Sequence, residues 1–507
     1  MENSMYEVRF KTSPDFRIKR APNSTIGEPW PLPQLYNVKY DNVFKINESL
    51  SIHIRNYSCD ILQKAIDRFK VNIFEFSLEE YYTNFLHIEA SGFQNLNKKY
   101  HQDTLDIKKT GIVLRSEEVW GALRGIETLS QVIFSYKGQL YVRDTSIRDF
   151  PRFKHRGVLV DSARHFMTKE VMLDILEGMY QNKMNVLHWH LVDDQSFPYQ
   201  SKVFPDLSNK GAYHPSLVYT HEDITDIIEY ARLRGVRVIP EFDTPGHVYG
   251  WGFGHPEMLT QCYDERKQKI PGCYGPLNPA RNTTYQFLEK LYTEIINIFP
   301  DKTLHLGSDE VPLECWNSNP EVPKDAIIQI WLGGAREVLR AIDQGYRVLF
   351  SSCWYLDNIP HGVHWMNYYK CEPTFKDPRE DKILGGEVCL WSEYITSETA
   401  ISVLWPRASA AAERLWSSSA VTDIEAAGKR LQEHRCRMLR RGLQVGQING
   451  PDYCFLPRQR KVVEKEDIHR KNYNHENIIR LSSKNSFSWK YINIIEPFVI
   501  GISFSSK

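Results

Sequence analysis

The sequence lacks a net charge and lacks an apolar run long enough to cross a membrane. Segment 492–504 is the relevant apolar stretch, but it is short and is interrupted by Glu496 and Pro497, whereas a membrane helix needs about 18 apolar residues. Lysine plus arginine equal aspartate plus glutamate at 63 each, and there is no long basic run with interleaved aromatics of the kind that binds nucleic acid. We therefore predict neither a membrane span nor a nucleic-acid partner.

Phosphate-binding fingerprints are also missing. Neither G-x-x-x-x-G-K-[ST] nor a strand-following G-x-G-x-x-G occurs, so we predict no nucleotide cofactor. Residues 1–20 hold no apolar core of signal-peptide length. Four Asn-x-Ser/Thr sequons nevertheless favour a secretory route, and they begin at Asn23, Asn47, Asn56 and Asn282.

A chain of 507 residues exceeds what one hydrophobic core usually organises, so we expect two domains. We interpret 1–28 as an extension, 29–150 as a small α+β domain, 151–455 as a catalytic domain and 456–507 as a divergent, loose tail. Alternating runs at 50–54 and 72–76 predict strands in the small domain. Its last element is a helix over 119–132, where Trp120, Leu123, Ile126 and Leu129 share helical spacing.

After residue 155, short apolar runs alternate with helix-length amphipathic segments, which predicts parallel strands with helical crossovers. The helices include 168–182, capped by Thr168, and 221–233. We expect strands at 157–161, 185–191, 236–242, 303–307, 327–332, 347–351 and 384–390.

Polar and acidic residues follow nearly every one of these strands, which favours a (βα)8 TIM-type barrel with its active site at the carboxyl ends. A doubly wound sheet would gather such groups at one switch point instead. Only sixteen residues, with three prolines, separate Glu310 from Ile327. Because that length cannot hold a helix and a strand, we expect the barrel to lack one helix–strand unit.

Asp309 and Glu310 are adjacent carboxylates at the end of the fourth predicted strand. Two acids in one pocket push their pKa values apart, so one stays ionised while the other serves as a general acid. An Asp-Glu dipeptide alone is more often a surface feature. The preceding apolar strand and the groups described next favour the catalytic interpretation.

Two further stretches concentrate histidines and acids. His188 and His190 share one face of a strand, and because no second cluster supplies ligands at recognised spacing, we predict buried, hydrogen-bonded histidines and no metal site. Asp243 and His247 flank a tight turn, where a structural hydrogen bond and a role in orienting the catalytic acid are equally compatible with the sequence. Tryptophans at the same strand ends suit a sugar pocket, namely Trp331, Trp354 and Trp391.

Several motifs, in order, resemble glycoside hydrolase family 20, specifically its animal lysosomal-type β-N-acetylhexosaminidases and their beta subunits. They are DSARH from Asp161, HWHLVDD from His188, PEFDTPGH from Pro240, GSDEV from Gly307, WYLD from Trp354, GGEVCLWSE from Gly385 and LWPRA from Leu404. The resemblance covers residues from about 29 to 454 and implies a lysosomal or secreted enzyme, a homodimer or a heterodimer with a related subunit, that acts on terminal N-acetylhexosamine glycans.

The family uses a substrate-assisted mechanism, in which the sugar's own acetamido oxygen attacks its anomeric carbon. The resemblance implies that Glu310 is the acid and base, that Asp309 holds the acetamido nitrogen and that Tyr355 binds the acetamido oxygen. It places His247 behind the acid. It assigns sugar binding to Arg164, Asp193, Trp331, Trp354, Asp357, Trp391 and Glu393, and Asp357 indicates uncharged substrates.

The same resemblance implies disulfides Cys262–Cys315 and Cys436–Cys454 and leaves Cys59 without a partner. The sequence departs from the family pattern at Ser308, where glycine is usual, and in the helix and strand missing between Glu310 and Ile327. These departures keep a second hypothesis open, a catalytically impaired sugar-binding or interaction paralogue. A metal-dependent hydrolase or deacetylase is a distant third hypothesis, because the ligand spacing is missing.

Overall fold

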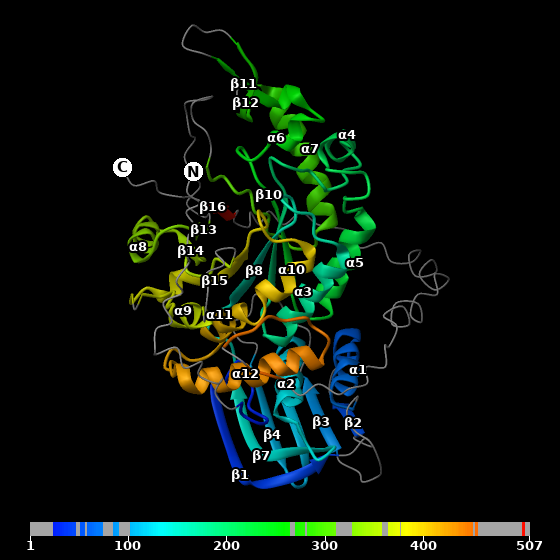
Figure 1. Ribbon diagram of the computed structural model, residues 1–507, viewed down its shortest axis with the longest axis vertical. Helices are drawn as coiled ribbons and strands as arrows, with labels where there is room; N and C mark the ends of the chain where they lie inside the picture. Colours follow the sequence, from blue (N-terminus) through cyan, green and yellow to red (C-terminus); the bar gives the residue numbers. More distant parts are fainter. Residues whose placement is uncertain are drawn as a thin grey trace, which may run out of the picture.

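A computed structural model of the chain describes two large β-sheets, each associated with its own hydrophobic core. The sheets lie one above the other along the long axis of the molecule (Figure 1). The described residues are 24–46, 51–55, 58–74, 85–90, 102–263, 269–278, 281–310, 327–356, 364–375, 377–449, 452–454 and 499–501.

The first sheet has the strand order β1-β7-β4-β5-β3-β2, with β6 paired to β7. Its strands are β1 (Leu35–Ile46), β2 (Ser51–Arg55), β3 (Phe85–Ala90), β4 (Asp103–Lys108), β5 (Gly111–Ser116), β6 (Phe134–Tyr136) and β7 (Gln139–Asp149). Helices α1 (Asp60–Phe74) and α2 (Val119–Val132) accompany this sheet. The predicted helix over 119–132 is confirmed, and its four spaced apolar residues are all buried.

The strand predicted at 72–76 is wrong where the structure describes it, because residues 72–74 end helix α1. The core positions of this helix are Ile61, Leu62, Ala65, Ile66, Phe69 and Ile73. Their spacing of three and four residues is a helical period. The short alternation at 72–76 is therefore the end of a longer helical pattern.

The second sheet is parallel and has the order β10-β9-β8-β15-β14-β13-β16. Its strands are β8 (His155–Asp161), β9 (Val186–Val192), β10 (Arg237–Phe242), β13 (Ile327–Ile330), β14 (Arg347–Phe350), β15 (Ile383–Leu390) and β16 (Val499–Gly501). Six of the seven predicted strands are thus present, and the first strand pairs with the last predicted one, β8 with β15. The barrel-type fold is confirmed, although the barrel is partial.

The fourth predicted strand, 303–307, is not a regular strand but lies beside β10. His305 donates its backbone N–H to Pro240 O at 3.0 Å, and Phe242 donates to His305 O at 3.1 Å. Gly307 then turns the chain with φ +63°, which ends the extended conformation after one bridge. The segment still carries its residues to the carboxyl end of the sheet.

The tail contributes to the same sheet, in contrast to the loose segment that the sequence suggested. Residues Val499–Gly501 form β16, parallel to β13, with Ile327 opposite Val499. Strand β16 lies on the free edge of β13, opposite β14. A backbone segment at this edge pairs N–H and C=O groups that would otherwise be exposed.

Helices accompany the second sheet, and the last of them lies between the two sheets (Figure 1). They are α3 (Lys169–Gln181), α4 (Asp206–Gly211), α5 (His221–Arg232), α6 (Tyr249–Gly252), α7 (Asn282–Ile298), α8 (Ala335–Asp343), α9 (Trp365–Lys370), α10 (Ser397–Leu404), α11 (Arg407–Trp416) and α12 (Ile424–Arg440). A small hairpin, β11 (Leu259–Tyr263) with β12 (Lys269–Leu277), extends from this part of the molecule (Figure 1). The predicted cap of α3 is confirmed, since the Thr168 hydroxyl accepts from Val171 N–H. Within the described residues, no helix is both long and apolar enough to span a membrane.

Candidate active site

The predicted site residues that the structure describes follow the carboxyl ends of the parallel strands. Parallel strands bring these ends to one face of a barrel, which is where such folds place their chemistry. Arg164 follows β8, Asp193 follows β9, His247 follows β10, Asp309 and Glu310 follow segment 303–307, Tyr355 follows β14, and Trp391 and Glu393 follow β15.

Arg164 is held between two buried carboxylates. Its guanidinium donates to Asp161 Oδ2 at 3.2 Å and forms an ion pair with Asp193 Oδ2 at 2.8 Å, while its Cζ lies 5.2 Å from the centre of the Trp391 ring. Burial alone would lower the pKa of Arg164, but the charges of Asp161 and Asp193 raise it. The guanidinium is thus a fixed cation against an aromatic wall, an arrangement suited to sugar hydroxyls.

The structure brings His247 between Asp193 and Glu310. His247 Nδ1 lies 3.4 Å from Asp193 Oδ1, and its Nε2 lies 3.7 Å from Glu310 Oε2. Burial would lower the pKa of His247, but its hydrogen bond to Asp193 and the neighbouring carboxylates raise it to about 9. A protonated imidazole therefore faces the Glu310 carboxyl, whose side chain is 59% exposed at the mouth of the site.

A tight turn presents Asp309 and Glu310. Ser308 and Glu310 have positive φ angles of 73° and 46°, a conformation that non-glycine residues seldom adopt. The Ser308 N–H donates to Asp243 Oδ1 at 3.0 Å, and its hydroxyl donates to Thr244 O at 2.9 Å. These two bonds compensate for the strain that explains why glycine is usual at this position.

Asp243 lies beneath this turn. Burial, together with the charges of Glu241 and Asp309, raises the pKa of its carboxyl well above the usual range. Oxygens of Asp243 and Asp309 and a nitrogen of His247 lie within 4.8 Å of one another. A neutral Asp243 avoids a second buried negative charge close to Glu241.

The aromatic residues occupy different environments. Trp391 is half-buried, with its ring 6.5 Å from that of Tyr355 and 5.1 Å from that of His190. Trp354 is fully buried, and its indole N–H donates to Tyr368 O at 3.0 Å. Trp331, directly after β13, is half-buried. Trp391 and Tyr355 therefore share one wall of the site with Arg164.

One predicted site residue and part of the disulfide prediction lie outside the described residues. Asp357 and Cys315 fall in ranges that the structure does not describe, although Cys262 is disulfide-bonded. The Cys436–Cys454 bond is confirmed, with an S–S distance of 2.02 Å, and Cys59 is free as expected. A further disulfide, Cys353–Cys371, was not predicted.

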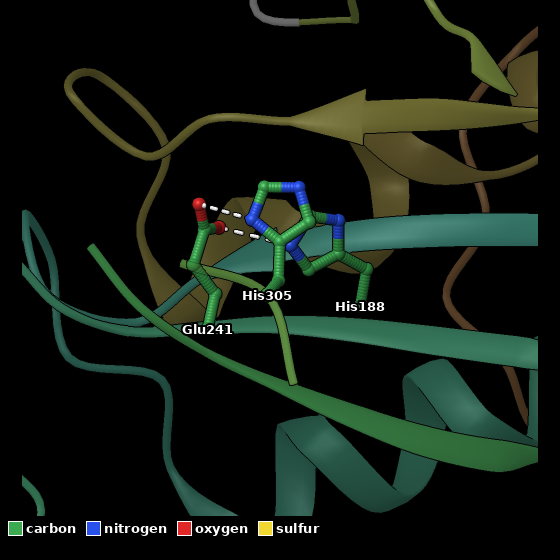
Figure 2. A group of neighbouring side chains, drawn as sticks. All are labelled: His188, Glu241 and His305. Atoms are coloured by element: carbon green, nitrogen blue, oxygen red, sulfur yellow. Dashed lines mark hydrogen bonds and ion pairs between the residues drawn. The ribbon is translucent and has the colours of Figure 1, made fainter. Parts of the chain in front are cut away.

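His188, Glu241 and His305 form one group of possible metal ligands, and Figure 2 shows both rings facing the carboxylate of Glu241. His188 Nε2 is 2.9 Å from Glu241 Oε2, and His305 Nδ1 is 2.8 Å from Glu241 Oε1. Two such ligands of one tetrahedral zinc ion would lie about 3.3 Å apart, because each sits about 2.0–2.1 Å from the metal. The His188 contact is a hydrogen bond to a carboxylate, as expected for a buried histidine, whereas His305 Nδ1 accepts from the Gly307 N–H.

The sequence did not assign site roles to Asp161, Glu241 or His190, although their motifs were recognised, and it left open whether Asp243 orients the catalytic acid. Each is buried beneath the predicted site residues. An acid or histidine inside an apolar strand was the available signal, since such groups are rarely buried without a partner. What the sequence could not supply was the identity of those partners.

Comparison with known proteins agrees with this geometry. The catalytic-domain profile of glycosyl hydrolase family 20 matches residues 153–325 and 320–419. The human beta-hexosaminidase subunit beta is 40% identical over 500 residues, which cover 84% of this chain and 89% of that protein. The chain belongs to glycosyl hydrolase family 20. The mouse beta-hexosaminidase subunit alpha is 38% identical over 506 residues, covering 84% and 94% of the two chains.

A solved structure of a family 20 chitobiase from Flavobacterium johnsoniae superimposes with a TM-score of 0.74 at 28% identity, covering 82% of this chain and 73% of that one. This glycosyl hydrolase is therefore a glycosidase of the β-N-acetylhexosaminidase type. The alternative of an impaired sugar-binding paralogue is not favoured. The two matched ranges overlap at residues 320–325. These residues lie in the short stretch where the sequence predicted that a helix and a strand are missing.

Proposed function

We propose that this family 20 enzyme removes terminal, non-reducing N-acetylglucosamine or N-acetylgalactosamine by substrate-assisted hydrolysis with retention. The observation that carries this proposal is the placement of Asp309 and Glu310 on one tight turn, with His247 behind Glu310 at 3.7 Å. Adjacent acids with unlike surroundings serve two different tasks in one reaction.

In the first step, the Glu310 carboxyl donates its proton to the glycosidic oxygen, and the C1–O bond breaks. The acetamido oxygen of the same sugar bonds to C1 and forms an oxazolinium ion. Positive charge then develops on the acetamido nitrogen, where the Asp309 carboxylate stabilises it. Tyr355 donates its hydroxyl to the acetamido oxygen and orients it for attack.

In the second step, the Glu310 carboxylate takes a proton from water as that water attacks C1, which reopens the oxazolinium ring. Arg164 and Glu393 bind sugar hydroxyls, and Trp331 and Trp391 enclose the ring and the acetamido methyl group. The side chains of Asp193 and Trp354 are fully buried, so they support the pocket and do not touch the sugar. The ion pair between Arg164 and Asp193 at 2.8 Å supports this assignment. A guanidinium already fixed by carboxylates loses little freedom when substrate binds.

The test is release of the chromophore from an aryl N-acetyl-β-glucosaminide at acid pH, with monodisperse protein and the Glu310→Gln variant alongside. We expect Glu310→Gln to lose about 100-fold or more in kcat, the usual size of general acid catalysis. Asp309→Asn keeps the turn but cannot offset the oxazolinium charge, so its kcat should also fall. A folded wild-type protein without activity would overturn the proposal.

Substrate charge is part of the proposal. Asp357 would repel a 6-sulfate group on the sugar, because two negative charges interact strongly in a water-poor pocket. We expect clear preference for the uncharged aryl substrate over its 6-sulfated analogue. Comparable turnover of both would contradict the preference but would leave the hydrolase assignment intact.

The relatives are named as alpha and beta subunits, which supports association of this chain with a second copy or with a related subunit. We infer a dimer in a lysosomal or secreted location. Light scattering measures the mass of the purified protein in solution. A mass of about 59 kDa, that of one chain, would contradict the dimer.

A further inference from the structure

Seven titratable side chains alternate between carboxylate and histidine from the interior of the barrel to its mouth. We refer to them as the His–carboxylate chain, which runs through Glu387, His188, Glu241, His190, Asp193, His247 and Glu310. The successive nitrogen–oxygen distances are 2.8, 2.9, 2.7, 2.7, 3.4 and 3.7 Å. The first five members are buried.

His190 occupies the position in this chain that connects the interior to the site. Its Nδ1 lies 2.7 Å from Glu241 Oε2, and its Nε2 lies 2.7 Å from Asp193 Oδ2. Both partners are carboxylates, and a histidine donates from both nitrogens only as the imidazolium. Burial would lower the pKa of His190, but the charge of Glu241 and the hydrogen bond to Asp193 raise it well above the usual value.

Asp193 depends on several donors at once. Oδ2 is hydrogen-bonded to His190 and forms an ion pair with Arg164 at 2.8 Å, while Oδ1 accepts from the Asp194 N–H at 2.6 Å and faces His247 at 3.4 Å. Burial would raise the pKa of Asp193, but the hydrogen bonds from His190 and His247 lower it. The charge and the orientation of Asp193 therefore depend both on His190, toward the interior, and on His247, toward Glu310.

We propose that His190 is a positioning residue of the hydrolase reaction: as a buried cation it fixes Asp193, and Asp193 in turn orients His247 against the acid Glu310. This inference rests on the proposed function, because it concerns the same acid. It extends the site inward, to a residue in strand β9 that touches neither substrate nor Glu310.

A purely structural role for His190 is the competing explanation, since it connects β9 to Glu241 of β10. His188 provides a matched control. It lies on the same strand, is equally buried, binds the same Glu241 oxygen and also has a carboxylate at each nitrogen. His188 contacts Glu387 in place of Asp193, so it shares the structural role but not the proposed positioning role.

The chemistry of the amides separates the two contacts of His190. In His190→Gln, the amide reaches the place of Nε2 and still donates to Asp193. In His190→Asn, the amide takes the place of Nδ1 and donates only toward Glu241. Both substitutions remove the positive charge, so a higher kcat in His190→Gln than in His190→Asn shows that the Asp193 contact matters more to the reaction than the Glu241 contact.

The experiment measures kcat, KM and unfolding midpoints for His190→Asn, His190→Gln and His188→Gln in the full chain, with wild type and Glu310→Gln as references. We expect His190→Asn to lose about 100-fold in kcat with KM nearly unchanged, and His190→Gln to recover about tenfold of that loss. His188→Gln should lower the unfolding midpoint similarly but keep kcat within about fivefold.

The pH profile is a second readout that a structural role would not move. The alkaline limb of kcat reports loss of the Glu310 proton. Removing a nearby buried cation favours the protonated acid, so both His190 variants should move this limb to higher pH by about half a unit or more. In His188→Gln the limb should stay in place.

Two outcomes would overturn the inference. One is an equal kcat in His190→Asn and His188→Gln. The other is an equal loss of kcat in the two His190 variants with the alkaline limb of the pH profile unmoved. If one His190 variant does not fold, the other still distinguishes positioning from structure against His188→Gln. A failure of the proposed function would look different. The wild-type protein would then show no hydrolysis that is lost in Glu310→Gln.

Discussion

The turn before Asp309 and Glu310 depends on one glycine. A Cβ on Gly307 would lie 1.8 Å from Asp243 Oδ1, and the φ angle of +63° disfavours any side chain. Gly307→Ala must therefore displace Asp243 and, with it, the turn that carries the two carboxyls to which we assign catalysis. Side chains a few tenths of an ångström out of place cost enzymes much of their rate.

We predict that Gly307→Ala lowers kcat/KM at least tenfold and the free energy of unfolding by about 2–4 kcal/mol, from backbone strain and overpacking together. Gly138→Ala is the matched control, because it has φ +75° and open space around it. It should cost about 1 kcal/mol and leave activity unchanged. Enzyme assays and urea unfolding measure both effects, and equal activities in the two variants would contradict the prediction.

Among the elements, helix α5 shows how local sequence fixes a boundary. Thr220 and Asp223 form a capping box, in which the Asp223 N–H donates to the Thr220 hydroxyl and the Asp223 carboxylate accepts from Thr220 N–H. The sequence prediction of a helix over 221–233 agrees with α5, which spans His221–Arg232. Capping signals of this kind are local and are therefore readable without the fold.

We predict that Thr220→Ala lowers the free energy of unfolding by about 1 kcal/mol, because helix N–H groups lose their acceptor. Thr225→Ala, on the exposed face of the same helix, should change it by less than about 0.5 kcal/mol. Urea unfolding gives both values. A Thr225→Ala loss as large as that of Thr220→Ala would mean that the cap does not carry the effect.

The strands show where element prediction fails. Segment 303–307 has the composition of a strand but only one bridge, because its length along β10 is limited by the turn at Gly307. Strand β16 comes from a region without periodicity and pairs only because β13 offers an edge. We propose that the domain boundaries predicted near residues 28, 150 and 455 hold, since each sheet has its own core.

For the whole molecule, the buried ionic groups predict a dependence of stability on pH. The carboxylates of Glu387 and Glu241 overcome burial and raise the pKa of His188 to about 9, and His247 is also at about 9. An unfolded histidine titrates near 6.5. The stabilisation is therefore complete below about pH 6.5 and is lost as the pH rises through about 9.

A shift from 6.5 to about 9 corresponds to roughly 3 kcal/mol for a group such as His247. The raised pKa of Asp243, caused by burial and by the neighbouring acids, acts in the same direction. At the acid end, hydrogen bonds hold the pKa of Asp193 low against burial, so its contribution is lost as the pH falls below about 4. We expect maximal stability at mildly acidic pH.

Urea unfolding midpoints between pH 4.5 and 9.5 test this expectation. The midpoint should fall between pH 6.5 and 9, and His188→Gln should make that fall shallower because one of the groups is gone. A flat or rising midpoint over this interval would show that these histidines are not protonated in the folded protein.

The sequence by itself determined the family, the barrel-type fold and the helices at 119–132 and 168–182, and it indicated Asp309 and Glu310 as the proposed catalytic pair. These depend on local periodicity, capping residues and short motifs, all of which are written in neighbouring positions. The tertiary structure alone decided which acid faces which histidine, and so the protonation of Asp243 and His190. Those states depend on burial and on charges that come from different strands, and no stretch of neighbouring residues records them.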